Sequence, residues 1–242
     1  MLVIALLTDF GLADPWVGVM KGVIGGIAPG VPVVDLSHGV PAQDVRTGAI
    51  HLDAAWRYFP GGTVFLCVVD PGVGTARRPI VARCEGRLFV APDNGIIGLL
   101  PGPEVRLVTA PWGLPDPSRT FHGRDVFAPV AARLASGTAF EEAGPVVTDH
   151  VRLSLPEPDG HRGEVIHVDR FGNLLTNLPG RDEGGVEVAG HEAPVVLTYG
   201  AVPTGALLAH TGSTGRLEVA LRDGSAATRL RVGVGAGVRW RG

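Results

Sequence analysis

The sequence predicts an α/β fold in two parts: an N-terminal α/β domain with a largely parallel central sheet, and a C-terminal all-β barrel domain. Up to about residue 155, short β-branched runs alternate with segments in which apolar residues recur at helical spacing. Beyond that point, short segments of alternating polarity recur between Gly, Asp and Asn residues. The proline-rich stretch 155–160 separates the two patterns, so we expect domains of residues 1–157 and 162–242.

The first part alternates expected strands with two expected helices. Asp14 and Pro15 provide a helix cap and a first-turn proline, and this helix ends before Pro29. A second helix is expected over residues 45–59. This alternation implies right-handed crossovers and a mainly parallel sheet, which binds ligands at the carboxyl ends of its strands. The expected strands are residues 2–7, 31–36, 63–69, 80–84 and 87–91.

The second part has the pattern of a small β-barrel or a sandwich. Its expected strands are short and separated by turn residues, and no helix is expected among them. These strands are residues 164–168, 185–188, 194–198, 216–221, 229–234 and 238–240.

Composition excludes several classes of function. With 45% hydrophobic and 19% charged residues, the 242-residue chain is not a charge-rich disordered protein. A net charge of −3 gives no reason to expect nucleic acid or an anionic membrane as a partner. The apolar start is too short for a secretory signal and no run approaches the ~20 apolar residues of a membrane helix, so a cytoplasmic protein with a small-molecule substrate is expected. Cys67 and Cys84 form no metal motif and are expected to be buried, reduced thiols.

Three carboxylates follow strands of the first part. Asp9, Asp35 and Asp70 are each expected at the carboxyl end of the sheet, where neighbouring parallel strands bring such residues together. Asp9 is either an Asx-turn residue or helix cap, or an acceptor for the hydroxyls of a diol such as a ribose. Asp70 is either a turn residue before Pro71 or a partner of Arg77, whose guanidinium can return over the turn.

The first part also has histidine candidates. His122 precedes an expected helix that Asp125 is expected to cap, and it is either an ordinary loop histidine or a site residue. His38 is the other candidate. The sequence contains no H-E-x-x-H, G-x-S-x-G or P-loop motif, so zinc protease, α/β-hydrolase and P-loop chemistry are unsupported, and no metal site is expected.

The second part has two unusually polar segments, 168–177 and 212–220. Each is either a hairpin loop or part of a binding site, because Gly-Asn and Ser-Thr-Gly are common turn sequences. Phe171 is either a core residue or an aromatic ring that covers an adenine face.

Taken in this order, the motifs resemble those of the S-adenosylmethionine hydrolases (adenosine-forming), also called SAM hydroxide adenosyltransferases, which are related to fluorinases and chlorinases. The resemblance spans nearly the whole chain. It implies a homotrimer in which the substrate lies between the first domain of one subunit and the second domain of its neighbour. The segments that carry it are residues 8–11, 35–38, 68–74 with 77–78, 91–95, 121–125, 169–173 and 213–220.

The resemblance also implies roles for individual residues. Asp70, Arg77 and His122 would orient and activate water, and Asp9 would hold the ribose hydroxyls. The second domain would contact the adenine and methionine ends of the substrate through Asp169, Phe171, Asn173, Ser213 and Glu218. No cofactor other than the substrate is implied.

Departures from the halogenating relatives bear on the choice of nucleophile. Those relatives have a more apolar, hydroxyl-lined pocket at the positions of Asp70 and His122, so the residues here favour water over halide. The halogenating relatives have a tryptophan near position 43, where this sequence has Gln43. Arg222 and Asp223 occupy the positions of the residue pair that contacts adenine in those relatives.

The expected chemistry is simple, because a sulfonium already leaves readily from the ribose 5′ carbon. An aligned water needs only concerted removal of a proton, since preformed hydroxide at pH 7 would cost roughly 12 kcal/mol. Halide-dependent adenosyl transfer, and binding of adenosine or S-adenosylmethionine without turnover, remain alternative functions.

Overall fold

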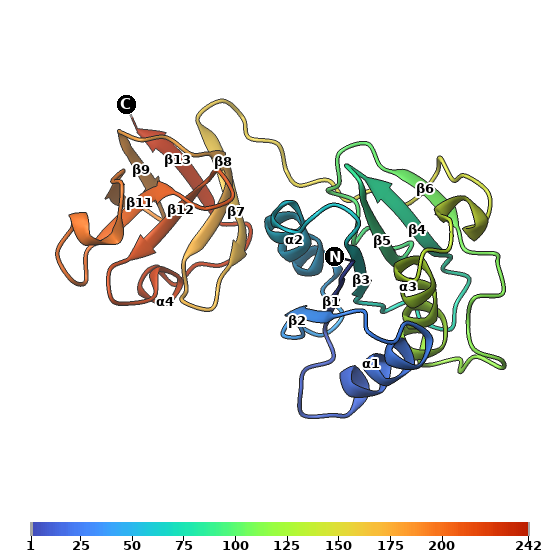
Figure 1. The fold of residues 1–242 in the computed structure, drawn as a ribbon. Helices are drawn as coiled ribbons and strands as arrows, with labels where there is room; N and C mark the ends of the chain where they lie inside the picture. The colour runs from blue at the N-terminus through green and yellow to red at the C-terminus, as the bar shows by residue number, and fades with distance from the viewer. Residues whose placement is uncertain (1, 242) are drawn as a thin grey trace. The chain divides into compact units, whose positions relative to one another are not determined.

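The computed structural model describes residues 2–241 and divides into two compact units, which meet in the sequence between Ser154 and Leu155. We refer to them as the first unit and the second unit and describe each by itself. Figure 1 shows the mixed sheet and its helices in the first unit and the β-rich second unit. Within the described residues, no helix has both the length and the apolar character needed to cross a bilayer.

The first unit contains a mixed sheet of six strands in the order β2-β1-β3-β5-β4-β6. The pairs β1–β2, β1–β3 and β3–β5 are parallel, whereas β4 is antiparallel to both β5 and β6. The strands are β1 (Ile4–Thr8), β2 (Val33–Ser37), β3 (Val64–Val68), β4 (Pro79–Cys84), β5 (Arg87–Pro92) and β6 (Glu104–Leu107).

The expectation of a largely parallel sheet is therefore correct on one side of the sheet and wrong on the other. β4 and β5 are joined by only two residues, Glu85 and Gly86, both with positive φ (44° and 72°). This is the backbone of a two-residue hairpin turn, which leaves no length for a crossover helix. Strand β6 was not predicted.

Three helices of the first unit flank the sheet, with α1 (Trp16–Ile27) and α3 (Ala128–Ala135) on one face and α2 (Val45–Ala55) on the other (Figure 1). The α2 cap is Asp44, whose carboxylate accepts a hydrogen bond from Thr47 N at 2.9 Å. The expected cap of α1 is wrong: Pro15 occupies that position and no side chain caps the helix. Beyond α2 the chain continues as a short 3₁₀ helix, Trp56–Tyr58.

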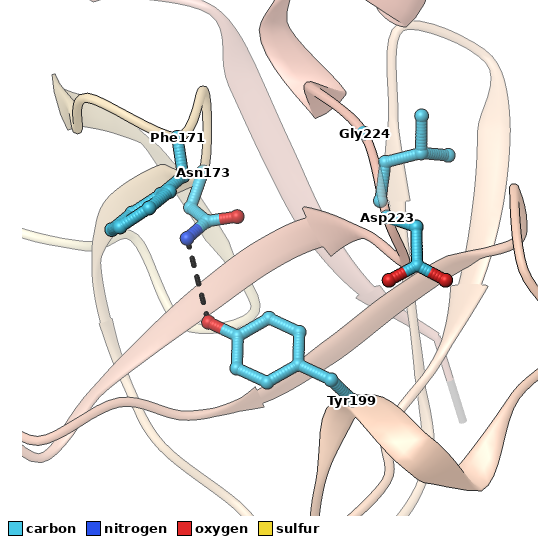
Figure 2. A pocket seen from close by; sticks show the side chains of 6 residues that line it. Phe171, Asn173, Tyr199, Asp223 and Gly224 are labelled. Atoms are coloured by element: carbon cyan, nitrogen blue, oxygen red, sulfur yellow. Dashed lines mark hydrogen bonds between the residues drawn. The ribbon is translucent and has the colours of Figure 1, made fainter.

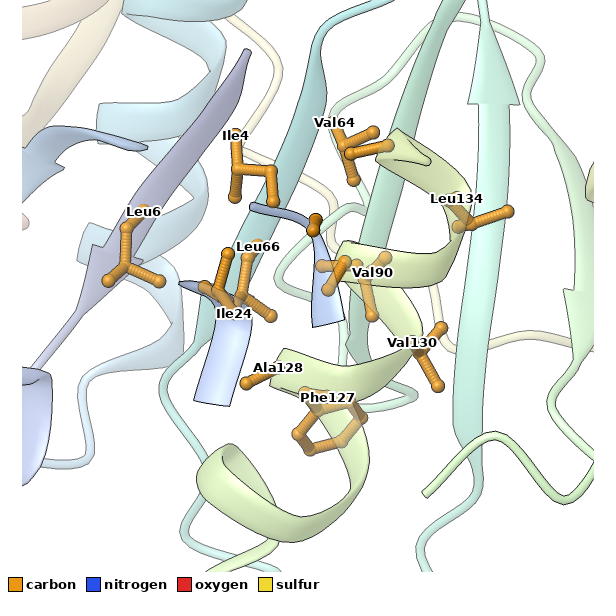
Figure 3. Packing of buried hydrophobic residues seen from close by; sticks show 14 of the residues in the cluster. Ile4, Leu6, Ile24, Val64, Leu66, Val90, Phe127, Ala128, Val130 and Leu134 are labelled. Atoms are coloured by element: carbon orange, nitrogen blue, oxygen red, sulfur yellow. The ribbon is translucent and has the colours of Figure 1, made fainter. Parts of the chain in front are cut away.

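Alternation along the central strands divides the core into two layers. Ile4 and Leu6 of β1 pack with Leu66 of β3 against α1 and α3, as Figure 3 shows. Ala5 and Leu7 face the opposite layer, which includes Leu52 of α2. All five residues of β3 are buried, which is the pattern of a central parallel strand. Cys67 and Cys84 are buried and free, as predicted.

The second unit is a nearly closed antiparallel sheet of seven strands in the order β10-β9-β13-β7-β8-β12-β11. Its two ends meet next to β10, where Val196 N donates to Ala209 O at 2.9 Å and Val195 forms a bridge with Ala209. The strands are β7 (Arg162–Val168), β8 (Leu174–Pro179), β9 (Gly185–Val188), β10 (His191–Pro194), β11 (Leu207–Thr211), β12 (Arg216–Leu221) and β13 (Gly237–Arg241).

Two of the expected elements in the second unit are wrong. The strand expected over 229–234 is instead the end of helix α4 (Ala226–Leu230), which Ser225 caps by accepting from Thr228 N at 3.1 Å. Strand β10 ends at Pro194, where a strand was expected to begin. Strands β8 and β11 were not predicted. The barrel-like architecture agrees with the sequence analysis even though these elements differ.

Candidate active site

The loop after β3 brings an acid and a guanidinium together. Val73 N donates to Asp70 O at 3.2 Å and Thr75 N donates to Gly72 O at 3.2 Å, so the chain turns back on itself within a few residues. Gly74 has a φ of +77°, and a Cβ there would lie 2.5 Å from Arg119 O. Both the backbone conformation and the space require glycine at this position.

Asp70, Arg77 and His122 form a compact cluster. Arg77 binds both oxygens of Asp70, with Nε–Oδ1 at 3.1 Å and Nη2–Oδ2 at 2.5 Å. The same Nη2 lies 3.0 Å from His122 Nδ1. Both side chains of the ion pair are buried, at 6% exposure for Asp70 and 7% for Arg77. The predicted convergence of these three groups is therefore present in the first unit.

His122 lies at the start of a single π-helical turn, Gly123–Phe127, that leads into α3. Such turns are rare in helices and occur often at functional sites. Asp125 was expected to cap α3, but it lies within the π-helical turn and does not cap that helix. It instead accepts from Ser118 N and from Arg124.

The surroundings of His122 favour its neutral form. Burial lowers the pKa of the imidazole, the positive charge of Arg77 lowers it further, and Asp70 and Asp125 oppose the shift. Because a guanidinium can only donate hydrogen bonds, His122 Nδ1 must accept from Arg77. In the neutral imidazole the proton is then on Nε2.

A cavity of about 280 Å³ opens beside the cluster. Asp9 lies at its edge just beyond β1, and its Oδ2 accepts from Gln43 N at 2.8 Å. Asp9 and Asp70 therefore share one cavity, as expected of residues that follow neighbouring parallel strands. The cavity is lined by Asp9, Phe10, Ala42, Gln43, Val68, Asp70, Pro71, Val73, Thr120, Phe121, His122 and Gly123.

The third carboxylate and the second histidine candidate do not line this cavity. Asp35 turns to α1, where it accepts from Lys21 Nζ at 2.7 Å, and its Oδ1 lies 3.0 Å from His38 Nε2. His38 is buried, and its Nδ1 lies 2.8 Å from Thr8 Oγ1. These two residues tie the ends of β1 and β2 together.

The second unit has its own cavity, of about 510 Å³, shown in Figure 2. Asn173 Nδ2 donates to Tyr199 Oη at 3.4 Å across it. Phe171 lines the same cavity with three quarters of its surface exposed, so it is not a core residue. The lining residues are Phe171, Asn173, Tyr199, Leu221, Asp223 and Gly224.

Asp169 shapes the turn beside this cavity. Its Oδ1 accepts from Phe171 N at 2.9 Å and from Asn173 N at 2.8 Å, and its Oδ2 accepts from Asn173 Nδ2 at 2.9 Å. The turn interpretation of this segment is therefore correct, and the same turn presents Phe171 and Asn173 to the cavity.

Ser213 and Glu218 are not among the residues that line either cavity. Ser213 is exposed in the turn that joins β11 to β12. Glu218 lies on β12, 3.8 Å from His210 Nε2 on β11. Burial raises the pKa of Glu218, the neighbouring His210 opposes the rise, and Asp169 adds to it. Among residues 2–241, no group of three or more His, Cys, Asp or Glu side chains is arranged to hold a metal ion.

Comparison with protein-family models decides the family. Residues 4–144 match the SAM hydroxide adenosyltransferase N-terminal domain and residues 163–239 match its C-terminal domain. The chain belongs to the SAM hydroxide adenosyltransferase family. The resemblance predicted from the motifs is thus confirmed.

Individual members of the family and their relatives support this assignment. The chain is 47% identical to the (R)-S-adenosyl-L-methionine hydrolase of Thermus thermophilus, covering 96% of this chain and 97% of the relative. It is similar to a solved structure of an uncharacterized conserved protein from Thermotoga maritima, with a TM-score of 0.91 and 38% identity over 99% of this chain and 100% of that chain. A fluorinase of an Actinoplanes species is 31% identical, over 73% of this chain and 71% of the relative.

Some lining residues of this family member could not be read from its sequence. Tyr199 lies 26 positions from the asparagine that it contacts and has no distinctive flanking motif. Gln43, noted as a departure from the halogenating relatives, lines the cavity next to Asp9. Its φ of 66° belongs to the left-handed region, which places its backbone N–H against the Asp9 carboxylate.

Proposed function

We propose that the protein hydrolyses S-adenosyl-L-methionine to adenosine and L-methionine, with water attacking the 5′ carbon of the ribose. The observation that carries this proposal is the buried Asp70–Arg77 ion pair in contact with the half-buried His122, beside a cavity that Asp70 and His122 line. Membership of the SAM hydroxide adenosyltransferase family supports it, as does the high identity to a protein named (R)-S-adenosyl-L-methionine hydrolase.

We assign proton acceptance to Asp70. Arg77 occupies one lone pair of each carboxylate oxygen, and each oxygen has a further lone pair for a water. His122 Nδ1 already accepts from Arg77, so this nitrogen is less available as a base. Its Nε2–H is free to donate to the oxygen of the same water and to orient it.

The proposed reaction is a single displacement. The water oxygen forms a bond to C5′ while the C5′–sulfur bond breaks. The electron pair of the C5′–sulfur bond stays on sulfur and gives the neutral thioether of methionine. The water proton passes to Asp70 and then to solvent.

We further propose that the substrate uses both units. Asp9 would accept from the ribose hydroxyls, while Asp169, Phe171, Asn173, Ser213 and Glu218 would contact the adenine and methionine ends. The cavity of about 280 Å³ is smaller than most ligand pockets, which span roughly 300–1,000 Å³, and this favours a site completed by a second surface. In a homotrimer, the first unit of one subunit and the second unit of its neighbour would supply the two surfaces.

The remaining expectations are part of the same proposal. The two units would correspond to domains of residues 1–157 and 162–242. The enzyme would be cytoplasmic and would need neither a metal ion nor a cofactor beyond its substrate.

A direct assay tests the proposed activity. Purified protein is incubated with S-adenosyl-L-methionine, with and without EDTA, and products are separated by chromatography. Equal amounts of adenosine and methionine in both samples are expected, and unchanged substrate at high protein concentration would reject the proposal. Formation of 5′-halo-adenosine after addition of chloride or fluoride would favour halide transfer. Stoichiometric binding without product would favour a binding module.

Mixed oligomers test the shared site. Asp70→Asn is defective in the first unit and Asn173→Ala in the second, and co-expression produces oligomers that contain both. If the site is built from neighbouring subunits, random mixing leaves one site in four intact, so about a quarter of wild-type activity returns. If each site is built within one subunit, every site carries a defect and no activity returns.

A further inference from the structure

The loop that carries Asp70 and Arg77 is fixed at both ends by two consecutive residues, Asp93 and Asn94. They directly follow β5 and belong to the segment 91–95, which the sequence analysis singled out without assigning a role. Neither residue lines the cavity beside His122.

Asn94 holds the beginning of the loop. Its Nδ2 donates to the backbone oxygen of Val69 at 2.8 Å, and Val69 is the residue directly before Asp70. Its Oδ1 accepts from Ile96 N at 3.2 Å, which fixes the orientation of the amide group. Val69 is fully buried, so a lost donor would not be replaced freely by bulk water.

Asp93 holds the end of the loop. Its carboxylate, 2% exposed, accepts from Arg78 Nε at 2.8 Å, and Arg78 Nη2 lies 2.6 Å away. Its backbone N–H also donates to Arg78 O at 2.9 Å. Arg78 is the residue directly after Arg77. The second oxygen of Asp93 accepts from Val151 N at 2.8 Å, so both carboxylate oxygens have a hydrogen-bond partner.

The spacing of these contacts gives the dipeptide its effect. Asn94 and Asp93, neighbours at the end of β5, form hydrogen bonds with Val69 and Arg78. The loop between positions 69 and 78 supplies both Asp70 and Arg77. A displacement of about 1 Å of a reacting group can cost on the order of 100-fold in rate. The turn hydrogen bonds within the loop fix its internal shape. The contacts that Asn94 and Asp93 make with its two ends fix its position relative to His122.

We propose that Asp93 and Asn94 are positioning residues, which hold the Asp70–Arg77 pair against His122 for attack by water. This inference rests on the proposed function. It assigns neither residue a contact with the substrate, so their loss should lower kcat more than it raises the Kd for adenosine.

The test compares two variants with the wild type. Asn94→Asp keeps the size of the side chain and its acceptor, but it places a carboxylate oxygen against Val69 O. Asp93→Asn removes the charge that faces Arg78. We expect each variant to lose about 10- to 100-fold in kcat, with a change of less than about 3-fold in the Kd for adenosine measured by calorimetry.

Asn177→Asp is a matched control in the second unit. Asn177 makes the same pair of contacts as Asn94, accepting from Glu164 N at 2.7 Å and donating to Pro156 O at 2.8 Å. This variant should lower the unfolding temperature as Asn94→Asp does, while kcat stays within about 2-fold of the wild type.

An NMR titration of His122 separates this inference from the proposed activity. The signal is assigned by its absence in His122→Gln. In Asn94→Asp, a displaced Arg77 no longer disfavours the imidazolium, so the pKa of His122 should rise towards its ordinary value. Folded Asn94→Asp with wild-type kcat and an unmoved His122 titration would overturn the inference, as would a rise in KM at unchanged kcat. If the wild type makes no adenosine, the proposed function fails. The His122 titration alone then decides whether the contacts of Asp93 and Asn94 position the loop.

Discussion

Replacing Asp70 by asparagine removes the group to which we assign the water proton. The change preserves size, and the amide oxygen can still accept from Arg77 Nε. The amide nitrogen, however, would face Arg77 Nη2 at the position where Oδ2 now lies 2.5 Å away. Two donors then oppose each other, and Arg77 loses its counterion in a site where its side chain is only 7% exposed.

The size of the effect follows from the two roles of the carboxylate. Loss of a general base reduces rates by about 10²- to 10⁴-fold, which corresponds to about 3–5 kcal/mol of transition-state stabilisation. Leaving Arg77 buried without its counterion lowers the free energy of unfolding by about 3–5 kcal/mol, the usual cost of removing one partner of a buried ion pair. Turnover should therefore fall by at least 100-fold in a protein that still folds.

The assay measures kcat from the rate of adenosine formation. Binding is measured by calorimetry with adenosine, an uncharged ligand whose affinity does not include a charge–charge interaction with Asp70. The Kd for adenosine should change by less than about 3-fold. Asp53→Asn is the matched control, because it makes the same substitution in the surface pair of Asp53 with Arg57 and should leave kcat unchanged. An Asp70→Asn variant with kcat near that of the wild type would refute the reasoning.

Three further changes test other parts of the account. Asp9→Ala should raise the Kd for adenosine at least about 10-fold in calorimetry, because a charged acceptor contributes about 1.5–3 kcal/mol, and an unchanged Kd would remove Asp9 from the ribose site. Because the folded state lowers the pKa of His122, kcat/KM should stay constant at neutral pH and fall only below the ordinary histidine pKa, and His122→Gln should abolish that decline. The lowered pKa of His122 also means that the folded state binds fewer protons than the unfolded state. The free energy of unfolding should therefore fall as the pH drops from the pKa of His122 in the unfolded state to its pKa in the folded state, and chemical denaturation of the wild type and His122→Gln checks this. Leu66→Ala on the fully buried β3 should lower the free energy of unfolding in urea by about 2–5 kcal/mol, and a loss below about 1 kcal/mol would contradict the packing of that layer.

The sequence predicts the parts of the site that depend on regular structure. Asp9 and Asp70 follow neighbouring parallel strands, and alternation of strands and helices was sufficient to place both at one edge. The convergence of Arg77 and His122 on Asp70 came from the order of motifs in a known family. Spacing alone allowed Asp70 to be an ordinary turn residue.

Other features depend on contacts that residue types do not reveal. Asp35 was expected to follow its strand like the other two carboxylates, but it lies in the middle of β2, where its carboxylate binds the ammonium group of Lys21 on α1 and does not line the cavity. The direction of β4 depends on the backbone of Glu85 and Gly86, a pair that is not a common hairpin sequence. Tyr199 lines the cavity of the second unit beside Asn173, a residue 26 positions away in the sequence, only because the chain is folded. Each of these outcomes required the folded chain.

The central claim is that Asp70, Arg77 and His122 direct a water molecule to the 5′ carbon of S-adenosyl-L-methionine. Reaction in ¹⁸O-labelled water, followed by mass spectrometry of both products, tests it most directly. One labelled oxygen should appear in adenosine and none in methionine, at a rate that falls in Asp70→Asn. Adenosine without label, or label in methionine, would contradict attack of water at that carbon.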